Sequence, residues 1–232
     1  MQTSIGNKKK FTSRATAPSS RRLIVVLTAC LTAGSLSQRI AQYTRGMRAS
    51  RVAFPWPAEL VLVEGNGSRF TELDTLGSEF AVRIFYTRNN AVDTSNYGLK
   101  ELLDVRAALD AVDAQDDDFV VKLTGRYVIE DARTSPFVQT VYALALPGHV
   151  DAVARFGSYA KPCAQDETVP DCVTGLIGTT ARVVRSVELP DTRQCVESKW
   201  AEAILALSQE RVKALGRLGV LIAPATNTFF DI

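Results

Sequence analysis

The chain has 232 residues, of which 46% are hydrophobic and 22% charged, so it is long enough for one sizeable core and short for two full domains. The net charge of +2 gives no electrostatic reason to expect nucleic-acid binding, and a single histidine excludes a histidine-rich metal site. The four cysteines contain no Cys-x-x-Cys pair, which argues against a structural zinc site.

The first 22 residues are rich in serine, threonine, lysine and arginine and contain no acidic residue. Such a composition offers little to pack. We therefore expect a disordered basic tail or a targeting arm over residues 1–22, followed by a single domain over residues 23–232.

A mostly apolar segment follows the tail, from Leu23 to Gly34, and three interpretations of it remain open. We favour the interpretation as a buried first strand, and in that case we expect a cytoplasmic protein. A secretory signal is the second, because Leu27-Thr28-Ala29-Cys30 resembles a lipoprotein cleavage box that would leave Cys30 as a lipid anchor; a transit peptide is the third. No transmembrane span is expected, because crossing a bilayer takes about 20 apolar residues.

Strands and helices alternate through the first half of the chain. We expect strands at 23–28, 59–64, 80–86 and from Phe119 onward, and helices at 37–50 with Ser37 as N-cap, at 70–76 and at 96–112. A linker with two prolines covers 51–57, and a turn-rich Glu64-Gly-Asn66-Gly loop follows the second strand. This alternation predicts an α/β fold with a mostly parallel sheet flanked by helices.

The second half is less regular. The pattern favours strands at 137–146 and 172–178, a helical turn at 151–156, a helix at 179–187 and a long amphipathic helix at 195–216.

The richest cluster of polar residues lies at the end of the strand that starts at Phe119. It reads Lys122-Leu-Thr124-Gly125-Arg126-Tyr127, and in open α/β sheets ligands bind beyond the carboxyl ends of the strands. Lys122 and Arg126 can contact phosphate oxygens there, the first as a point charge and the second as a planar fork. The alternative is that both are surface residues of an edge strand.

Four segments taken in order resemble one family: Val-Val-Leu-Thr28-Ala29, Leu-Val-Leu-Val-Glu64-Gly-Asn66-Gly, Asn96-Tyr97-Gly98-Leu-Lys100-Glu101, and Val-Val-Lys122-Leu-Thr124-Gly125-Arg126-Tyr127. Together they are similar to glycosyltransferases of the Rossmann-like GT-A fold, in particular to bacterial and large-virus enzymes of surface polysaccharide synthesis. The resemblance runs from about residue 23 to 129. It implies a nucleotide-sugar half at about 23–130, an acceptor half at about 131–232, and transfer of a sugar to a glycan or other hydroxyl acceptor.

The resemblance also implies roles for particular residues. Nucleotide binding falls to Thr28, Ala29, Glu64 and Asn66, although Glu64-Gly-Asn66-Gly can also be no more than a polar turn. Further substrate contacts fall to Lys100, Lys122, Thr124 and Gly125. Arg126, which would contact the diphosphate together with Lys122, is a candidate catalytic residue.

The chain departs from the family at its metal motif. GT-A enzymes carry an Asp-x-Asp after this strand for Mn²⁺ or Mg²⁺, and Thr124-Gly125-Arg126 occupies that place. Asp116-Asp117-Asp118 precedes the strand, at the wrong end of the sheet, and reads as a solvated turn. Metal dependence is left open: Glu130 and Asp131 are possible ligands, and Arg126 can supply the missing positive charge.

An inverting transfer needs a general base near the acceptor hydroxyl. Among the acidic residues of the second half, Glu197 is slightly favoured because it begins a helix that can face the crevice, and a favourable interaction with the helix dipole is an equally good explanation for it. The full set of candidates is Asp166, Glu167, Asp171, Glu188 and Glu197.

Two other classes of function stay open. The missing Asp-x-Asp favours a nucleotide-sugar-binding homologue without catalysis. The cleavage box at Cys30 favours a secreted or lipid-anchored binding protein, for which the sequon at Asn66-Gly-Ser68 would be a glycosylation site.

Overall fold

A computed structural model describes residues 20–31, 35–67, 70–129, 131–157, 171–191, 194–222 and 230–231. A seven-stranded sheet forms its centre, in the order β3-β2-β1-β4-β6-β5-β7, and β6 alone runs against the others. The strands are β1 (Leu23–Ala29), β2 (Glu59–Glu64), β3 (Arg83–Tyr86), β4 (Phe119–Thr124), β5 (Ala152–Ala154), β6 (Leu176–Thr180) and β7 (Val212–Ala214). The expected α/β fold with a mostly parallel sheet is confirmed.

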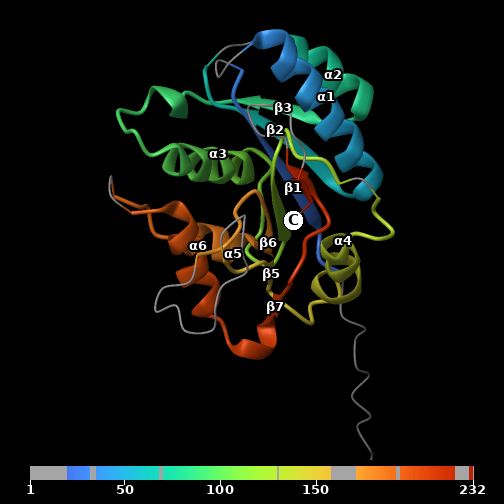
Figure 1. Cartoon of the computed structure of the whole chain (residues 1–232), viewed down its shortest axis with the longest axis vertical. Helices are drawn as coiled ribbons and strands as arrows, with labels where there is room; N and C mark the ends of the chain where they lie inside the picture. The colour runs from blue at the N-terminus through green and yellow to red at the C-terminus, as the bar shows by residue number, and fades with distance from the viewer. Residues whose placement is uncertain are drawn as a thin grey trace, which may run out of the picture.

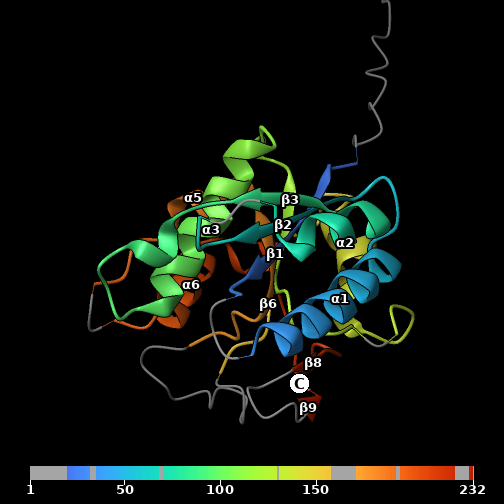
Figure 2. The same cartoon turned by 90° about the horizontal axis from the view of Figure 1, so that it is seen from above.

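Helices cover both faces of the sheet, as Figures 1 and 2 show. One face is covered by α1 (Leu36–Ala53), α2 (Glu72–Phe80), α4 (Pro136–Thr140) and the π-helical turn η2 (Val141–Ala145). The other is covered by α3 (Tyr97–Ala111), α5 (Ala181–Ser186) and α6 (Val196–Leu205). Short 3₁₀ turns η1 (Asn89–Ala91) and η3 (Gln209–Arg211) and a β8–β9 pair (Leu221–Ile222 with Phe230–Asp231) complete the described elements.

The apolar run at residues 23–29 is β1, so its interpretation as a strand is confirmed. All seven of its side chains are buried, and they alternate between the two cores: Val25 and Leu27 pack under α1, whereas Ile24 and Val26 pack under α3. β1 is one of the two inner strands among the four parallel strands that run side by side, and cleavage before Cys30 would remove it. None of the helices that the structure describes has the length and apolarity needed to span a bilayer.

The order of strands reverses next to β1. The chain passes from β1 outward through β2 to β3, and then returns to place β4 on the other side of β1. The register sets Thr28 directly beside Thr124, and Ala29 beside Glu64. Such a reversal opens a crevice at the carboxyl ends of the strands. Because β4 lies between β1 and β6, the interpretation of Lys122 as an exposed residue of an edge strand is wrong.

Several expectations for the second half are wrong. Residues 137–146 are helical, because Pro136 fits the first turn, the Ser135 hydroxyl accepts from Val138 N (3.4 Å), and Phe137, Val141 and Ala145 fall on one buried face. Residues 152–154 form a strand. The last long helix ends at Leu205, and the following segment forms β7 at the edge of the sheet.

Smaller differences concern boundaries in the first half. Helix α1 begins at Leu36 after Ser35 and continues to Ala53, into the expected linker. Helix α2 begins after Thr71, which forms a capping box with Asp74, so Phe80 ends a helix and does not begin a strand.

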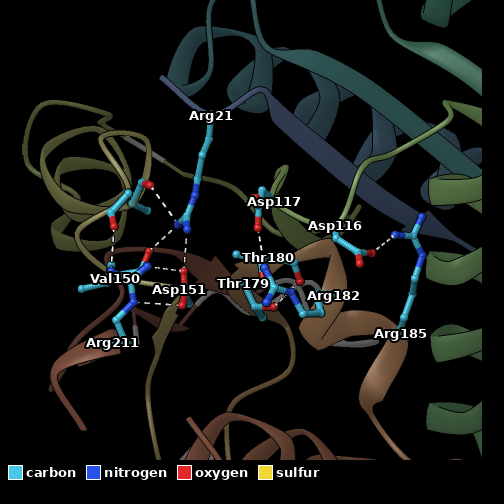
Figure 3. A network of polar contacts seen from close by, with 12 residues as sticks. Arg21, Asp116, Asp117, Val150, Asp151, Thr179, Thr180, Arg182, Arg185 and Arg211 are labelled. Carbon is cyan, nitrogen blue, oxygen red and sulfur yellow. Dashed lines mark hydrogen bonds and ion pairs between the residues drawn. The ribbon is translucent and has the colours of Figure 1, made fainter. Parts of the chain in front are cut away.

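Arg21 and Arg22 belong to the folded part of the chain, although the sequence predicts a disordered tail that includes both. Arg21 forms an ion pair with Asp151 (2.6 Å) and donates to Val150 O (2.7 Å), as Figure 3 shows. Arg22 pairs with Glu59 and with Asp118 (3.4 Å). Residues 1–19 lie outside the described residues.

Candidate functional site

A cavity of about 680 Å³ opens at the carboxyl ends of the parallel strands, where the strand order reverses. Its lining comes from the ends of β1 and β4, the segments after β2 and β3, helices α1, α3 and α6, and the segment before β6. The lining residues are Thr28, Ala29, Cys30, Arg39, Tyr43, Asn66, Asn90, Tyr97, Gly98, Lys100, Glu101, Asp104, Thr124, Arg126, Tyr127, Thr174 and Glu197. Sequence reasoning named seven of these: Thr28, Ala29, Asn66, Lys100, Thr124, Arg126 and Glu197.

A polar network centred on Glu101 forms the floor of the cavity. Lys122 Nζ pairs with Glu101 Oε2 (2.8 Å), while Thr28 Oγ1 (2.5 Å) and Thr124 Oγ1 (3.3 Å) donate to Glu101 Oε1. Lys122 also donates to Thr174 O (2.5 Å) and has only 3% of its side chain exposed. Lys122 therefore lies beneath the lining, where it holds Glu101 in place, and a contact between Lys122 and substrate stays a prediction.

The charge of Lys122 decides the protonation state of Glu101. Burial raises the pKa of the Glu101 carboxyl, but the positive charge and hydrogen bond of Lys122 outweigh it and the net pKa is lowered. Glu101 is therefore an ionised carboxylate whose oxygens are already occupied.

The wall beyond β2 is formed by two asparagines. Asn66 N donates to Glu64 Oε2 (3.0 Å), and Asn90 Nδ2 donates to Asn66 Oδ1 (2.9 Å). Glu64 is fully buried and also accepts from Leu31 N (3.1 Å), so it lies behind the lining and orients Asn66. Within the Glu64-Gly-Asn66-Gly loop, Asn66 is the residue that reaches the cavity, and a contact between Asn66 and substrate stays a prediction.

Asp104 is a second acidic group in the wall, and sequence reasoning missed it. It accepts from Asn89 Nδ2 (2.7 Å) and from the Thr87 hydroxyl. Burial, helped by the negative charges of Glu101 and Glu64, raises its pKa to about 6 against the effect of those hydrogen bonds.

Three cationic side chains line the cavity from three different elements. Arg39 comes from α1, Lys100 from α3 and Arg126 from the turn after β4. Lys100 Nζ donates to Asn90 O (2.9 Å) and lies 6.0 Å from the centre of the Tyr97 ring. Burial raises the pKa of Tyr43, and the hydrogen bond with Cys30 and the positive charges of Arg126 and Arg39 offset only part of this rise.

Two glycines bring α1 against the turn after β4. A Cβ atom on Gly46 would lie 2.0 Å from Gly125 O, and one on Gly125 would lie 2.8 Å from Thr28 O. Gly125 N also donates to Thr28 O (2.9 Å). Gly125 therefore does not line the cavity; the absence of its side chain lets α1 present Arg39 and Tyr43 beside Arg126.

Glu197 faces the cavity from the first turn of α6. This helix is held against the start of α3, because Asn96 Nδ2 donates to Gln194 O (2.9 Å) and a Cβ on Gly98 would lie 2.2 Å from Val196. The other described candidates for the base have different partners: Asp171 accepts from Ser198 (2.6 Å), and Glu188 pairs with Lys199 (3.3 Å). Asp166 and Glu167 lie outside the described residues.

The acidic run before β4 lies at the opposite end of the strand from the cavity. The interpretation as a solvated turn fits Asp116 and Asp117, which are exposed, but is wrong for Asp118, which is buried and pairs with Arg22. Asp116 pairs with Arg185 (2.7 Å) and Asp117 with Arg182 (Figure 3), at the amino end of the strand. Asp131 is exposed and its Oδ1 accepts from Arg133 N (2.8 Å), and Glu130 is not among the described residues. Over the described ranges no group of three or more His, Cys, Asp or Glu residues is arranged to hold a metal ion.

No protein-family model and no curated protein matches the chain. Its structure is similar to that of TarS from S. aureus, with a TM-score of 0.52 and 13% identity over 84% of this chain and 35% of that chain. Two other solved structures resemble it: the mannosyltransferase PcManGT from Pyrobaculum calidifontis in complex with GDP-Man and Mn²⁺ (TM-score 0.48, 14% identity, 85% of this chain and 56% of that chain), and a 4-diphosphocytidyl-2C-methyl-D-erythritol synthase (TM-score 0.49, 13% identity, 91% and 94%).

At 13% identity the similarity to TarS shows the fold alone. The GT-A-type fold expected from the sequence resemblance is confirmed, and the cavity lies at the end of the sheet where such a fold binds its ligand.

Proposed function

We propose that the chain is a glycosyltransferase that moves a sugar from a nucleotide-sugar donor to a glycan or other hydroxyl acceptor. The observation that carries this proposal is the composition of the carboxyl-edge cavity, which combines three cations with a carboxylate on the helix that faces them. Cations suit the diphosphate of the donor, and the carboxylate suits an acceptor hydroxyl.

The donor would lie across β1 and β4. Thr28, Ala29 and Asn66 are placed to contact the nucleoside, and Lys100 and Arg126 to contact the diphosphate. Glu64, Lys122 and Gly125 would act indirectly, because the first orients Asn66, the second holds Glu101, and the third admits α1.

Glu197 is our candidate for the general base. In the transfer, the acceptor oxygen bonds to the anomeric carbon while the bond from that carbon to the diphosphate breaks. The diphosphate leaves with the bonding electron pair, and Glu197 accepts the proton of the acceptor hydroxyl. No oxidant or reductant is needed.

A homologue that binds nucleotide sugars without catalysis is the second candidate. Thr124-Gly125-Arg126 stands in place of the acidic metal motif, and this observation favours it. Binding of a nucleotide sugar without its consumption would identify this case.

Calorimetric titration of the full chain with UDP, GDP, CDP and dTDP tests the proposal. We expect one diphosphate to bind with a one-to-one stoichiometry and to name the donor class. A folded chain that binds none of the four would contradict a nucleotide-sugar site.

A further inference from the structure

The divalent cation that this fold usually holds does not fit the donor set at the end of β4. The residues after Leu123 are a threonine, a glycine and an arginine, and the acidic run lies at the other end of the strand, paired with arginines. Mn²⁺ and Mg²⁺ need oxygen ligands, and a guanidinium at the ligand position repels them. We infer that the cavity neutralises the donor diphosphate with Arg39, Lys100 and Arg126 and without a divalent cation. This inference rests on the proposed function.

The acidic side chains that reach the cavity have other partners. Glu101 Oε1 accepts from Thr28 and Thr124, and Oε2 pairs with Lys122, so a metal ion would have to displace a buried ammonium. Asp104 accepts from Asn89 and Thr87. Among the described residues lining the cavity, Glu197 is the remaining carboxylate, and it stands on the helix assigned to the acceptor side.

The cationic groups have the arrangement that an anion site needs. They come from α1, α3 and the β4 turn, and each of the three residues is partly buried, so their charges act through a less screened medium than bulk water. Lys100 is anchored by Asn90 O and the Tyr97 ring. Arg39 and Arg126 lie on the two sides of the contact made possible by Gly46 and Gly125.

Arg39, Lys100 and Arg126 would stabilise the negative charge that develops on the leaving diphosphate. As the bond between the anomeric carbon and the diphosphate breaks, the electron pair moves onto the diphosphate, and fixed positive charges stabilise it without further reorganisation. Arginine also binds phosphate through two parallel N–H···O bonds, a geometry that an ammonium does not provide.

The test is a titration of the full chain with UDP, GDP, CDP and dTDP, each in EDTA and in MnCl₂. We expect the diphosphate that binds to have the same Kd in both solutions to within about threefold. A Kd at least tenfold tighter in MnCl₂, or protein-dependent loss of the free Mn²⁺ signal in electron paramagnetic resonance when that diphosphate is added, would overturn the inference and leave the proposed function standing. If none of the four binds in either solution, the proposed function fails as well.

Substitutions test the three cations separately from the metal. Arg39→Ala, Lys100→Ala and Arg126→Ala should each raise the Kd in EDTA by about 10- to 100-fold, as expected for a lost hydrogen bond to a charged group. Arg48→Ala is the matched control, because Arg48 lies on α1, 67% exposed and away from the cavity lining, with contacts to Glu79 (3.9 Å) and to the Phe80 ring (5.4 Å). Unchanged Kd values in all three variants would overturn the assignment. Circular dichroism checks that each variant folds, and Arg126→Lys and Arg39→Lys replace any alanine variant that does not.

Discussion

Lys122 carries a positive charge beneath the cavity floor, where an unpaired charge is costly. Its partner Glu101 connects it to Thr28 and Thr124, the last polar residues of β1 and β4. The ion pair therefore ties together the two strands between which the donor is proposed to bind.

Lys122→Met should destabilise the protein by about 3 kcal/mol, because it leaves the Glu101 carboxylate without its counter-charge. The double variant Lys122→Met with Glu101→Gln should recover a large part of this loss, because a neutral amide has little need of the ammonium. Urea unfolding of the two single variants and the double variant measures the coupling. Additive losses would show that the pair contributes nothing specific.

The raised pKa of Asp104 makes the stability of the folded protein depend on pH. Its pKa is raised to about 6, so the folded state binds the proton more tightly than the unfolded state does. The stabilisation from protonation is complete below pH 3.8, the ordinary pKa, and is lost as the pH rises through about 6. At higher pH the wild type folds with an unfavourably placed carboxylate.

Asp104→Asn should therefore stabilise the protein by about 1–3 kcal/mol at pH 8, and the gain should vanish near pH 4. The amide oxygen of asparagine can still accept from Thr87 and Asn89. Urea unfolding at the two pH values measures the gain, with Asp110→Asn, an exposed position on α3, as control. A gain that is independent of pH would contradict this account.

At the scale of elements, the approach of α1 to the β4 turn shapes one wall of the cavity. Gly46 and Gly125 meet there with no room for a side chain, and Tyr43 packs beside them and accepts from Cys30 N (2.6 Å). The position of α1 thus determines where Arg39 and Tyr43 stand relative to Arg126.

Gly46→Ala should destabilise the protein by about 1–3 kcal/mol, because overpacking outweighs the higher helix propensity of alanine. It should also weaken binding of the nucleoside diphosphate, since α1 must move away from Arg126. Thermal unfolding and the calorimetric titration measure the two effects. Gly216→Ala is the control, because a Cβ there meets nothing within 4 Å.

The sequence predicts most reliably those strands and helices that are formed by a local pattern of apolar residues or by a capping residue. β1, β2 and β4 each contain a run of at least three consecutive apolar residues, and α3 has a clear helical period with Asn96 as its cap. Alternating apolar and polar residues predict a strand at 137–146. The segment is helical instead, because Ser135 caps it and its apolar side chains pack against the sheet. β7 forms only because β5, about sixty residues earlier, pairs with it.

In the candidate site, too, the sequence predicts the residues at the ends of strands but not those placed by contacts distant in sequence. Thr28 and Thr124 lie at the carboxyl ends of buried strands and Arg126 follows one, and these positions alone place them at the cavity. Arg39, Tyr43 and Asp104 were missed, because their positions depend on contacts between helices and strands distant in sequence. The spacing of Arg39 and Tyr43, one helical turn apart after β1, was the one signal available.

At the scale of the whole molecule, Arg21 links the segment before β1 to the far edge of the sheet. Asp151 pairs with both Arg21 and Arg211 (2.6 Å each), and Arg21 also donates to Val150 O (Figure 3). Burial raises the pKa of Asp151, but the hydrogen bonds from Arg211 and Arg21 outweigh it and the net pKa is lowered. The contribution of Asp151 is therefore present above its ordinary pKa and lost in acid.

Arg21→Ala should destabilise the protein by about 1–2 kcal/mol at pH 7, because its side chain is only 14% exposed and its bonds to Asp151 and Val150 O are lost. The difference from wild type should shrink as the pH falls below that at which Asp151 is ionised. Chemical unfolding at pH 7 and pH 3 measures both. Arg182→Ala is the control, since its pair with Asp117 is exposed and should matter by less than about 0.5 kcal/mol.

Transfer of a sugar from a nucleotide donor in the carboxyl-edge cavity, as we propose it, releases a nucleoside diphosphate, and this release can be measured. Wild type, Glu197→Gln and Glu202→Gln would be incubated with UDP-, GDP-, CDP- and dTDP-sugars and a panel of hydroxyl acceptors. We predict acceptor-dependent release of nucleotide from one donor class, reduced by about 10²- to 10⁴-fold in Glu197→Gln and unchanged in Glu202→Gln, whose carboxylate is exposed. A folded wild-type chain that binds a nucleotide and releases none from any of these donors would contradict the claim and leave a binding protein.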